Sequence, residues 1–214
     1  MPVIVAMLNA KGGTGKSTQA INLGTALERR NKTVVIVDAD SAASSRDWAS
    51  ARPEGHPGRF PTVIAADRPE LLAATIKAIK ADYVIIDTPG SNELVSQKAI
   101  GVSHVALIVM KPSALDIWQA AITVAQINQK RDLGGEIEAA FLINCVASGT
   151  KLSKETLTGD WNSYGIPMLE TVIGNRVQFA ETIGNGESIF ESKDAGGKAE
   201  IESLVNELEK KSWL

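Results

Sequence analysis

The sequence predicts an α/β fold in which a single doubly wound, mostly parallel sheet is flanked by helices. Short apolar runs and helix-like segments alternate along the chain, which is the order of strands and crossover helices in a parallel sheet. Runs such as 34–37 are apolar at successive positions, as strands buried on both faces are. The 214 residues, of which 44% are hydrophobic, suit one globular domain with a full core, so we expect a single domain over residues 1–214.

The first strand is expected at 3–8 and is followed by a glycine-rich stretch, 9–18, and a helix-like segment over 20–30. A strand, a glycine-rich loop and a helix in this order form the context of a phosphate-binding loop. Glycines let backbone N–H groups turn inward around phosphate oxygens, and the N-terminus of the following helix adds partial positive charge. Lys16 is placed to reach the β- and γ-phosphates, and the Ser17 hydroxyl to bind Mg²⁺.

The start of this loop departs from the usual pattern of phosphate-binding loops. Ala10 stands where the first glycine is expected, and Lys11 adds a second lysine. The end of the loop, Gly15-Lys16-Ser17, fits the pattern. A glycine-rich turn with surface lysines is the plainer interpretation, and the flanking strand and helix argue against it.

The second strand, 34–37, leads into two carboxylates, Asp38 and Asp40, spaced i, i+2. At the carboxyl edge of a parallel sheet both can approach the same ligand crevice. Residues 41–51 then look helical, with Trp48 on the apolar side, and a short strand is expected within 60–66.

The next helix is expected to begin near Pro69, with Asp67 as N-cap and Glu70 at the capping-box position. Its predicted buried residues are Leu71, Leu72, Ile76 and Ile79. The apolar strand that follows, 82–86, ends in Asp87 before a Pro-Gly turn. This is the form of the second Mg²⁺-associated motif of phosphate-loop NTPases, in which a carboxylate at a strand tip holds the water shell of the metal.

The second half of the chain continues the alternation. Ser113 and Asp116 have capping-box spacing for a helix to about Arg131, and the sequence leaves capping and a role near the nucleotide equally open for Asp116. Asn144 lies near the end of one expected strand. The remaining expected elements are strands at 104–110, 138–146 and 167–173, helices at 151–164 and 175–183, and an amphipathic helix at 199–211 whose apolar face holds Ile201, Leu204, Val205 and Leu208.

Composition excludes several classes of protein. The net charge of −3, with 7 Lys+Arg against 11 Asp+Glu in residues 150–214, shows no strongly basic character, so an anionic partner must meet a local patch. The one cysteine, Cys145, excludes a disulfide framework or a cysteine metal site within one chain. Neither a signal peptide nor an apolar run of membrane-spanning length is visible, and we expect a cytoplasmic protein.

The motifs together resemble those of the ParA/MinD ATPases. Residues 11–18 are similar to their deviant phosphate loop (deviant Walker A), whose mark is the extra lysine, here Lys11. Residues 37–40 resemble their second motif and 85–90 their third. Two weaker matches, 112–116 and 188–192, are similar to the small ParA-type (ParF-like) partition proteins of plasmids. The resemblance runs nearly end to end, and because the first strand begins at Val3 no N-terminal helix-turn-helix is expected.

This resemblance implies a slow, partner-stimulated ATP hydrolase that uses ATP, ADP and Mg²⁺ and forms an ATP-dependent homodimer. Lys16 would bind the phosphates of its own subunit, and Lys11 would reach across the interface to the ATP of the partner. Asp40 would position the attacking water. Ser17, Asp38 and Asp87 would help to hold hydrated Mg²⁺. The nucleotide-binding residues would be Lys11, Gly12, Gly13, Thr14, Gly15, Lys16, Ser17, Thr18 and, for adenine, Asn144. Ser41-Ala42 departs from the Pro-Gln that usually follows the second aspartate.

The function that the resemblance implies first is partition of plasmid or chromosomal DNA. ATP-bound dimers would coat nonspecific DNA in the nucleoid, and a separate centromere-binding or adaptor protein would stimulate hydrolysis and release. Nonspecific binding needs phosphate contacts from basic residues. The candidates are Arg176, Lys193, Lys198, Lys210 and Lys211.

Three alternatives stay open on the sequence. One is nucleoid-based positioning of a protein cluster or microcompartment, which the ATPase motifs do not separate from DNA partition. Another is a MinD-like membrane-surface switch, which needs a basic amphipathic C-terminal helix; glutamates at 200, 202, 207 and 209 weaken lipid attraction, and no stable membrane association is expected. The last is an ATP-dependent carboxylation–cyclisation synthetase of related fold, which leaves Lys11 without a role.

Overall fold

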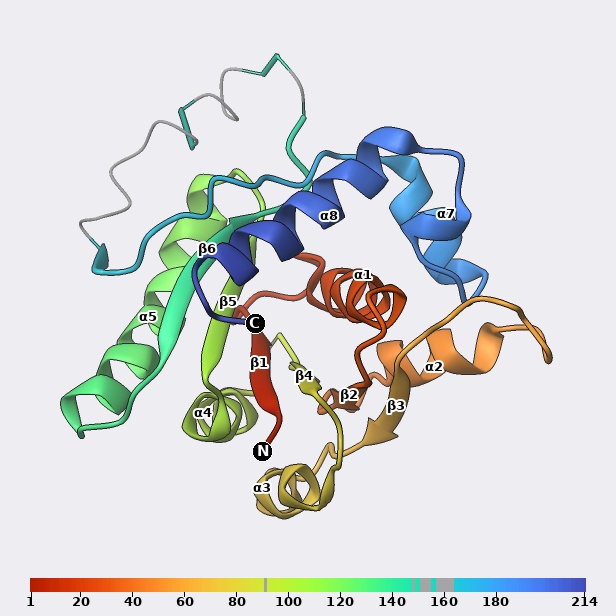
Figure 1. Ribbon diagram of the computed structural model, residues 1–214. Helices are drawn as coiled ribbons and strands as arrows, with labels where there is room; N and C mark the ends of the chain where they lie inside the picture. Colours follow the sequence, from red (N-terminus) through yellow and green to blue (C-terminus); the bar gives the residue numbers. More distant parts are fainter. Residues whose placement is uncertain (91, 148, 151–154, 157–163) are drawn as a thin grey trace.

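A computed structural model describes residues 1–90, 92–147, 149–150, 155–156 and 164–214 (Figure 1). Six strands form one sheet in the order β3-β2-β4-β1-β5-β6, and every pairing is parallel. The strands are β1 (Val3–Leu8), β2 (Val34–Asp38), β3 (Thr62–Ala65), β4 (Tyr83–Asp87), β5 (Val105–Met110) and β6 (Glu138–Ile143). The predicted doubly wound parallel sheet is confirmed.

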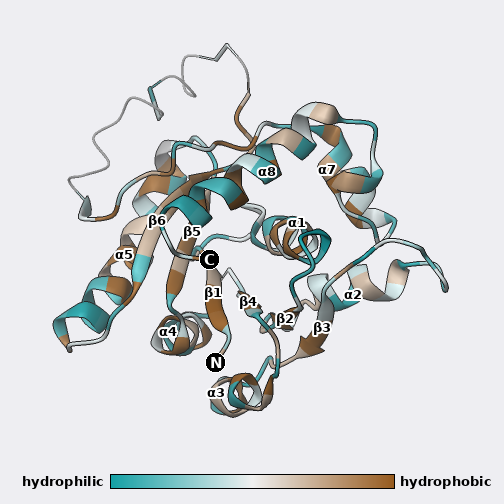
Figure 2. Cartoon of the chain, in the orientation of Figure 1, coloured by the Kyte–Doolittle hydropathy of each residue, from teal (hydrophilic) through white to brown (hydrophobic). Residues whose placement is uncertain are grey.

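Helices cover both faces of the sheet. They are α1 (Lys16–Arg29), α2 (Ser44–Ala51), α3 (Pro69–Ala78), α4 (Glu93–Val102), α5 (Ala114–Asp132), α7 (Val177–Gly184) and α8 (Ala195–Lys210), with a 3₁₀ turn, η2 (Ile189–Glu191). Side chains of α1, α2, α7 and α8 share one hydrophobic core, and those of α3, α4 and α5 share the other (Figure 1). Figure 2 shows apolar residues on strands such as β1 and polar residues on the outer side of α8.

The central strand β1 explains why the apolar runs are continuous. Val5 and Met7 belong to the core under α1 and α8, whereas Ala6 and Leu8 belong to the core under α4 and α5. Alternate side chains of a strand point to opposite faces, so a strand covered on both faces needs apolar residues at every position. Burial of this kind fixes β1, and with it the glycine-rich loop that follows.

Residues 167–173 do not form the expected strand. Within this segment Met168 makes an isolated bridge with Phe141 of β6, and the adjacent Gly174 makes a second one with Val146, after β6. The intervening backbone N–H groups of Glu170 and Thr171 instead donate to the carboxylate of Glu207 on α8, at 2.9 and 2.8 Å. Glu207 on the neighbouring helix therefore takes the N–H of Thr171, which is the donor that a ladder continuing from Leu169 would use next toward β6.

The start of α3 also differs from the prediction. Asp67 is not its N-cap, because the capping position belongs to Arg68, which makes no side-chain cap, and the Asp67 carboxylate lies 3.6 Å from the guanidinium of Arg46. Leu72 and Ile76 are buried as predicted, but Leu71 is 51% exposed. Residues i and i+4 share a helix face, so the positions of Leu72 and Ile76 turn Leu71 toward solvent.

Other boundaries follow from local capping. Helix α1 begins at Lys16, earlier than expected. The sequence did not predict α4 or η2. The side chain of Asn92 caps α4 by accepting a hydrogen bond from the N–H of Val95. The helix expected at 151–164 lies largely outside the described residues. Among the helices that the structure describes, none has the length and apolar character needed to cross a membrane.

Helix α8 packs over α1 with the predicted face inward. Ile201, Leu204, Val205 and Leu208 are fully buried. At the end of α1, the guanidinium of Arg30 holds α8 through carboxylates of Glu202 and Glu209, at 2.5 and 2.7 Å, and through Asn206. The helix that begins in the glycine-rich loop is thus held in place by the C-terminal helix.

Candidate nucleotide-binding site

The glycine-rich loop lies at the carboxyl end of β1, between β4 and β5, where ligand crevices of such sheets occur. Gly15 occupies the N-cap position of α1 with φ 100° and supplies no capping side chain, so the N–H groups of the first turn can receive an anion. A Cβ at Gly15 would lie 2.1 Å from Nδ2 of Asn144. Both the backbone conformation and the space therefore require glycine there.

Lys16 is held inside the loop. Its side chain is 6% exposed, and Nζ donates to the carbonyl oxygen of Lys11 at 3.0 Å. Burial lowers the pKa of Lys16, whereas the negative charges of Asp87 and Asp40 act in the opposite direction. The ammonium group is thus positioned by the backbone of the same loop and faces carboxylates from two neighbouring strand ends.

Asp87 lies at the tip of β4, in register with Asp38 on β2, and both are fully buried. Burial raises the pKa of Asp87 to about 6, hydrogen bonds from Ser45 and Ser17 oppose that rise, and the charge of Asp38 adds to it. Oδ2 accepts from the Ser45 hydroxyl at 2.7 Å, and within the described part of the chain Oδ1 has no partner. A buried, unpaired carboxylate oxygen beside the Ser17 hydroxyl fits a hydrated Mg²⁺.

Asp38 is already engaged by its own chain. Its Oδ2 accepts from the backbone N–H and the Nε of Arg46, at 3.0 and 3.3 Å, and its Oδ1 accepts from the N–H of Asp40. Asp40 in turn accepts the N–H of Ala42 at 2.9 Å. The structure therefore brings the predicted carboxylates of Asp38, Asp40 and Asp87 together beside the loop. The role of Asp38 in metal binding and that of Asp40 in positioning water stay predictions.

A pocket of about 370 Å³ opens between these elements. Its lining residues are Gly12, Gly13, Gly15, Lys16, Ser17, Thr18, Asp40, Ser44, Thr88, Gly90 and Ile183. Gly90 lies so close to the loop that a Cβ there would be 2.5 Å from the nitrogen of Gly12. Sequence reasoning missed Ser44, Thr88, Gly90 and Ile183 as lining residues; of these, only Thr88 and Gly90 lie within a recognised motif, at 85–90.

A larger hollow, of about 650 Å³, lies between α8 and residues 170–172. Glu170, Glu200 and Glu207 line it, beside Lys210 and Lys211. These three carboxylates disfavour a triphosphate, whereas the loop pocket combines Lys16 with free N–H groups of a helix start. The loop pocket is therefore the nucleotide candidate.

Lys11 faces its own subunit in this structure. Its Nζ lies 3.2 Å from Oδ2 of Asp116, a side chain only 2% exposed, while Lys11 itself keeps 36% exposure. Asp116 belongs to the start of α5, where its N–H donates to the Ser113 hydroxyl that caps the helix. Both possibilities that the sequence leaves open for Asp116 therefore have a physical basis, because it takes part in the cap and contacts the loop.

Asn144 supports the loop from beneath. Its Nδ2 donates to the carbonyl oxygen of Thr14 at 2.7 Å, and its Oδ1 accepts from Nε2 of Gln19 at 3.1 Å. The side chain is 3% exposed. These contacts hold the loop and the first turns of α1 against the end of β6, and the expected contact with adenine stays a prediction.

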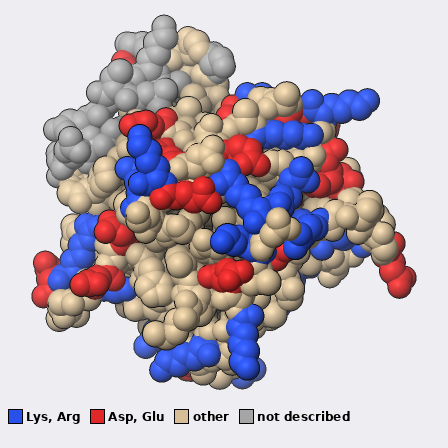
Figure 3. Space-filling view, in the orientation of Figure 1, with Lys and Arg blue, Asp and Glu red and all other residues tan. Residues whose placement is uncertain are grey.

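The basic candidates for DNA contact are not equivalent. Arg176 is occupied by Glu200 and Asp194, at 2.6 and 3.1 Å, so its charge is already compensated and it is a poor phosphate ligand. Lys193, Lys210 and Lys211 are exposed and Lys198 is half-buried. On the face that carries α8, Lys and Arg alternate with Asp and Glu (Figure 3). The Lys and Arg side chains that gather right of the centre of this face are bordered by Asp and Glu (Figure 3).

Comparison with known proteins places this site in a family context. The family model described as CobQ/CobB/MinD/ParA nucleotide binding domain matches residues 5–189. The maintenance of carboxysome distribution protein A of Halothiobacillus neapolitanus is 25% identical over 207 residues, covering 95% of each chain. Protein ParA of Rhizobium radiobacter is 27% identical over 204 residues, 92% of this chain and 89% of that protein. The fold matches septum site-determining protein MinD of Pyrococcus horikoshii, solved with Mg-ADP, at a TM-score of 0.68 and 22% identity, over 98% of each chain.

Proposed function

Since the chain belongs to the CobQ/CobB/MinD/ParA family of nucleotide-binding domains, we propose that it is an ATPase, made of one domain, that dimerises around ATP to move a cargo on DNA. The observation that carries this proposal is Lys11 at the mouth of the loop, partly exposed beside a pocket that already holds Lys16. One lysine suffices for phosphates of the same subunit. Lys11, which keeps 36% exposure while paired with Asp116 of its own chain, is a second cation that would exchange that pair for a phosphate brought by a partner subunit.

In the proposed mechanism the residues of the loop and of the neighbouring strand ends have separate roles. The N–H groups at the start of α1 and the Lys16 ammonium bind and orient the phosphates of ATP. Ser17 and Asp87 would hold hydrated Mg²⁺, which would supply positive charge beside the phosphates. Asp40 accepts a hydrogen bond from the attacking water and thereby positions it. Lys11 of the partner subunit neutralises the charge that develops on the γ-phosphate, as an arginine finger does.

We propose partition of plasmid or chromosomal DNA as the first function. ATP-bound dimers would bind nonspecific DNA through phosphate contacts, for which Lys193, Lys198, Lys210 and Lys211 are the candidates, and a separate centromere-binding or adaptor protein would trigger hydrolysis and release. The similarity to ParA over most of both chains supports this reading. A cytoplasmic, nucleoid-associated location follows from the same proposal.

The second candidate is positioning of a protein cluster or microcompartment on the nucleoid. A specific observation favours it, because a relative named for carboxysome distribution aligns over 95% of both chains. The two candidates share the ATPase cycle and differ in the adaptor and the cargo. A membrane-surface switch has less support, since the apolar face of α8 is fully buried against the core and Trp213 and Leu214 pack on the same cluster.

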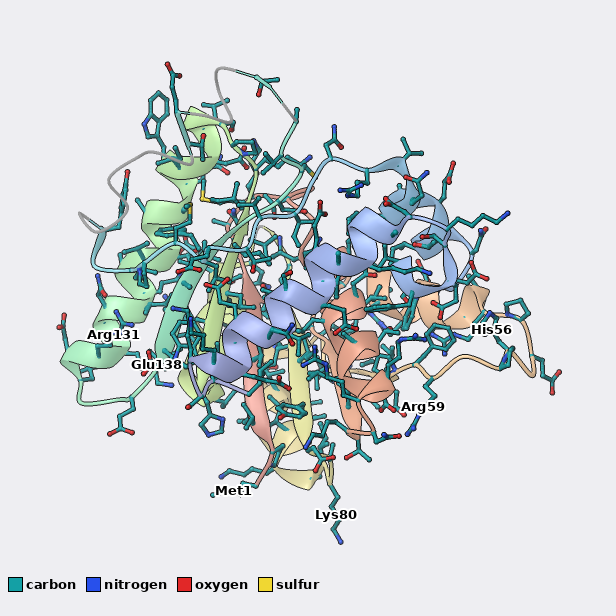
Figure 4. The ribbon with its side chains drawn as sticks, turned by 45° about the horizontal axis from the view of Figure 1, so that its top comes forward. Met1, His56, Arg59, Lys80, Arg131 and Glu138 are labelled. Atoms are coloured by element: carbon teal, nitrogen blue, oxygen red, sulfur yellow. The ribbon has the colours of Figure 1, made fainter. Side chains whose placement is uncertain are left out.

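The test compares Lys11→Ala with Lys16→Ala. Lys16→Ala is expected to lose ATP binding, whereas Lys11→Ala should retain nucleotide but fail to dimerise with ATP in light scattering. Lys80→Ala is the matched control, because Lys80 is an exposed lysine that precedes β4, at the end of the sheet opposite the loop (Figure 4). Normal ATP-dependent dimerisation of Lys11→Ala would contradict the cross-subunit role.

Sedimentation of the wild-type protein with ATP or ADP, offered nonspecific DNA and anionic vesicles separately, then tests the cargo surface. Association with DNA that needs ATP is expected. Association with vesicles alone would favour the membrane switch, and identical sedimentation with ATP and ADP would argue against an ATP-regulated cycle.

A further inference from the structure

The turn that carries Asp38 and Asp40 is held by its own short-range hydrogen bonds, in which the N–H groups of Asp40, Ala42 and Ala43 donate to oxygens of Asp38 and Asp40. Ser41, Ala42 and Ala43 follow the second aspartate, and none of them restricts the backbone as proline would. Ala43 adopts φ 62°, a left-handed conformation that is unfavourable for a residue with a Cβ. Such a backbone persists only when surrounding contacts hold it.

One side chain from α2 adds contacts to the turn from outside it. The guanidinium of Arg46, on the first turn of α2, donates from Nε to the Asp38 carboxylate at 3.3 Å and from Nη2 to the carbonyl oxygen of Asp40 at 3.0 Å. Nη2 also lies 3.6 Å from the carboxylate of Asp67, just after β3. One planar fork therefore joins the tip of β2, the turn and the segment that follows β3, which a point charge such as lysine cannot do.

The burial of Asp38 makes this contact significant. Asp38 is fully buried, whereas Arg46 is 32% exposed, so the guanidinium closes the outer side of a buried carboxylate. Arg46 does not line the loop pocket, and it thus acts on the site only through the residues that it holds.

We propose that Arg46 is a positioning residue that holds Asp38 and Asp40 in the geometry needed for nucleotide chemistry. The claim about the turn stands on the nucleotide-free structure alone. The claim about chemistry rests on the proposed ATPase function, in which Asp40 aligns water and Asp38 faces the metal. The two parts are tested by different measurements, so that failure of one is distinguishable from failure of the other.

The first measurement is hydrogen–deuterium exchange of the nucleotide-free protein in EDTA. In Arg46→Ala the amides of Asp40, Ala42 and Ala43 should exchange about tenfold faster or more. The guanidinium contacts the Asp38 carboxylate and the Asp40 carbonyl, so its loss frees the groups that accept from Asp40 and Ala43 and loosens the turn as a whole. Exchange in α8 should not change. Arg46→Lys should fall between wild type and Arg46→Ala, because the charge remains and the fork is lost. Arg59→Ala is the control, because Arg59 is an exposed arginine on the loop before β3 that contacts Asn31, after α1, and not the turn (Figure 4).

The second measurement is the affinity for a fluorescent ADP analogue, with Mg²⁺ and with EDTA, together with kcat and KM for ATP. Arg46→Ala should bind the analogue with wild-type affinity in EDTA. The increase in affinity that Mg²⁺ causes should be about tenfold smaller than in wild type. In ATP hydrolysis, kcat should fall by a larger factor than KM rises. Wild-type exchange at 40–43 in Arg46→Ala, or full recovery by Arg46→Lys, would overturn the positioning role. Faster exchange throughout α8 in both variants would show a general structural role instead and would equally overturn it. Faster exchange at 40–43 with no nucleotide binding by wild type would instead refute the ATPase proposal alone.

Discussion

Replacing Asp87 by asparagine is expected to stabilise the nucleotide-free protein at neutral pH. Asp87 is fully buried beside a second buried carboxylate, Asp38, and its pKa is raised from 3.8 to about 6. A rise of about 2 pKa units corresponds to roughly 3 kcal/mol of unfavourable free energy when the group is ionised in the folded state. Asparagine removes that charge and keeps the shape of the side chain. At about 2–4 °C per kcal/mol, Tm should rise by roughly 6–12 °C.

The pH dependence of this difference identifies its cause. A folded-state pKa above the unfolded value means that folding favours the protonated form, so the contribution of Asp87 to stability is fully present below about pH 4 and is lost as the pH rises to about 6. The wild type and Asp87→Asn should therefore melt together near pH 4. The difference in Tm between the two proteins should grow between about pH 4 and pH 6 and stay constant above pH 6.

Thermal unfolding in EDTA, without nucleotide, measures this difference in Tm. Asp82→Asn is a matched control of opposite sign, because Asp82 is exposed and hydrogen bonds from Thr33 lower its pKa, so the variant should be less stable than wild type at neutral pH. A lower Tm for Asp87→Asn at neutral pH, or the same increase at pH 4, would refute the reasoning. The gain in stability should be accompanied by loss of Mg²⁺-dependent nucleotide binding.

Three further changes test the support of the loop and of the core. Gly15→Ala should impair nucleotide binding and destabilise the protein by more than about 1 kcal/mol, because its φ is positive and its Cβ would strike Asn144; wild-type binding of a fluorescent nucleotide would contradict this. Asn144→Ala should cost about 1–3 kcal/mol in urea unfolding, since the carbonyl of Thr14 loses its buried donor, and an unchanged midpoint would be incompatible with that contact. Leu208→Ala should cost about 2–5 kcal/mol by the same assay, and a smaller effect would show that α8 packs loosely on the core.

The sheet and the loop were predictable because their signals are local. A strand covered on both faces must be apolar at successive positions, and β1 and β2 satisfy this almost without exception. The order of strand, glycine-rich loop and helix then fixes where the pocket lies, and strand tips place Asp38 and Asp87 beside it.

The errors arise where distant side chains decide the backbone or its partners. Residues 167–173 have the composition of a strand, but Glu207 takes two of their N–H groups. Asp67 has the spacing of a helix cap, but it faces Arg46 from α2 instead. The hydrogen bond from the Asn144 amide to the loop was likewise not foreseen, and the expected contact of Asn144 with adenine stays a prediction. None of these pairings leaves a periodic trace in the sequence, because each joins residues brought together only by the sheet.

Because α1 is synthesised long before α8, the contact between them matters for the growing chain. The phosphate loop and α1 leave the ribosome early. Arg30, at the end of α1, pairs with the carboxylate of Glu209, which follows it by 179 residues in the sequence. Until α8 is available, the apolar side of α1 that faces it has no cover, and the loop at its start lacks a fixed base. A nascent chain that stops short of α8 should therefore carry every phosphate-loop residue and still hold nucleotide poorly, which ties competence for ATP to completion of the helix at 195–210.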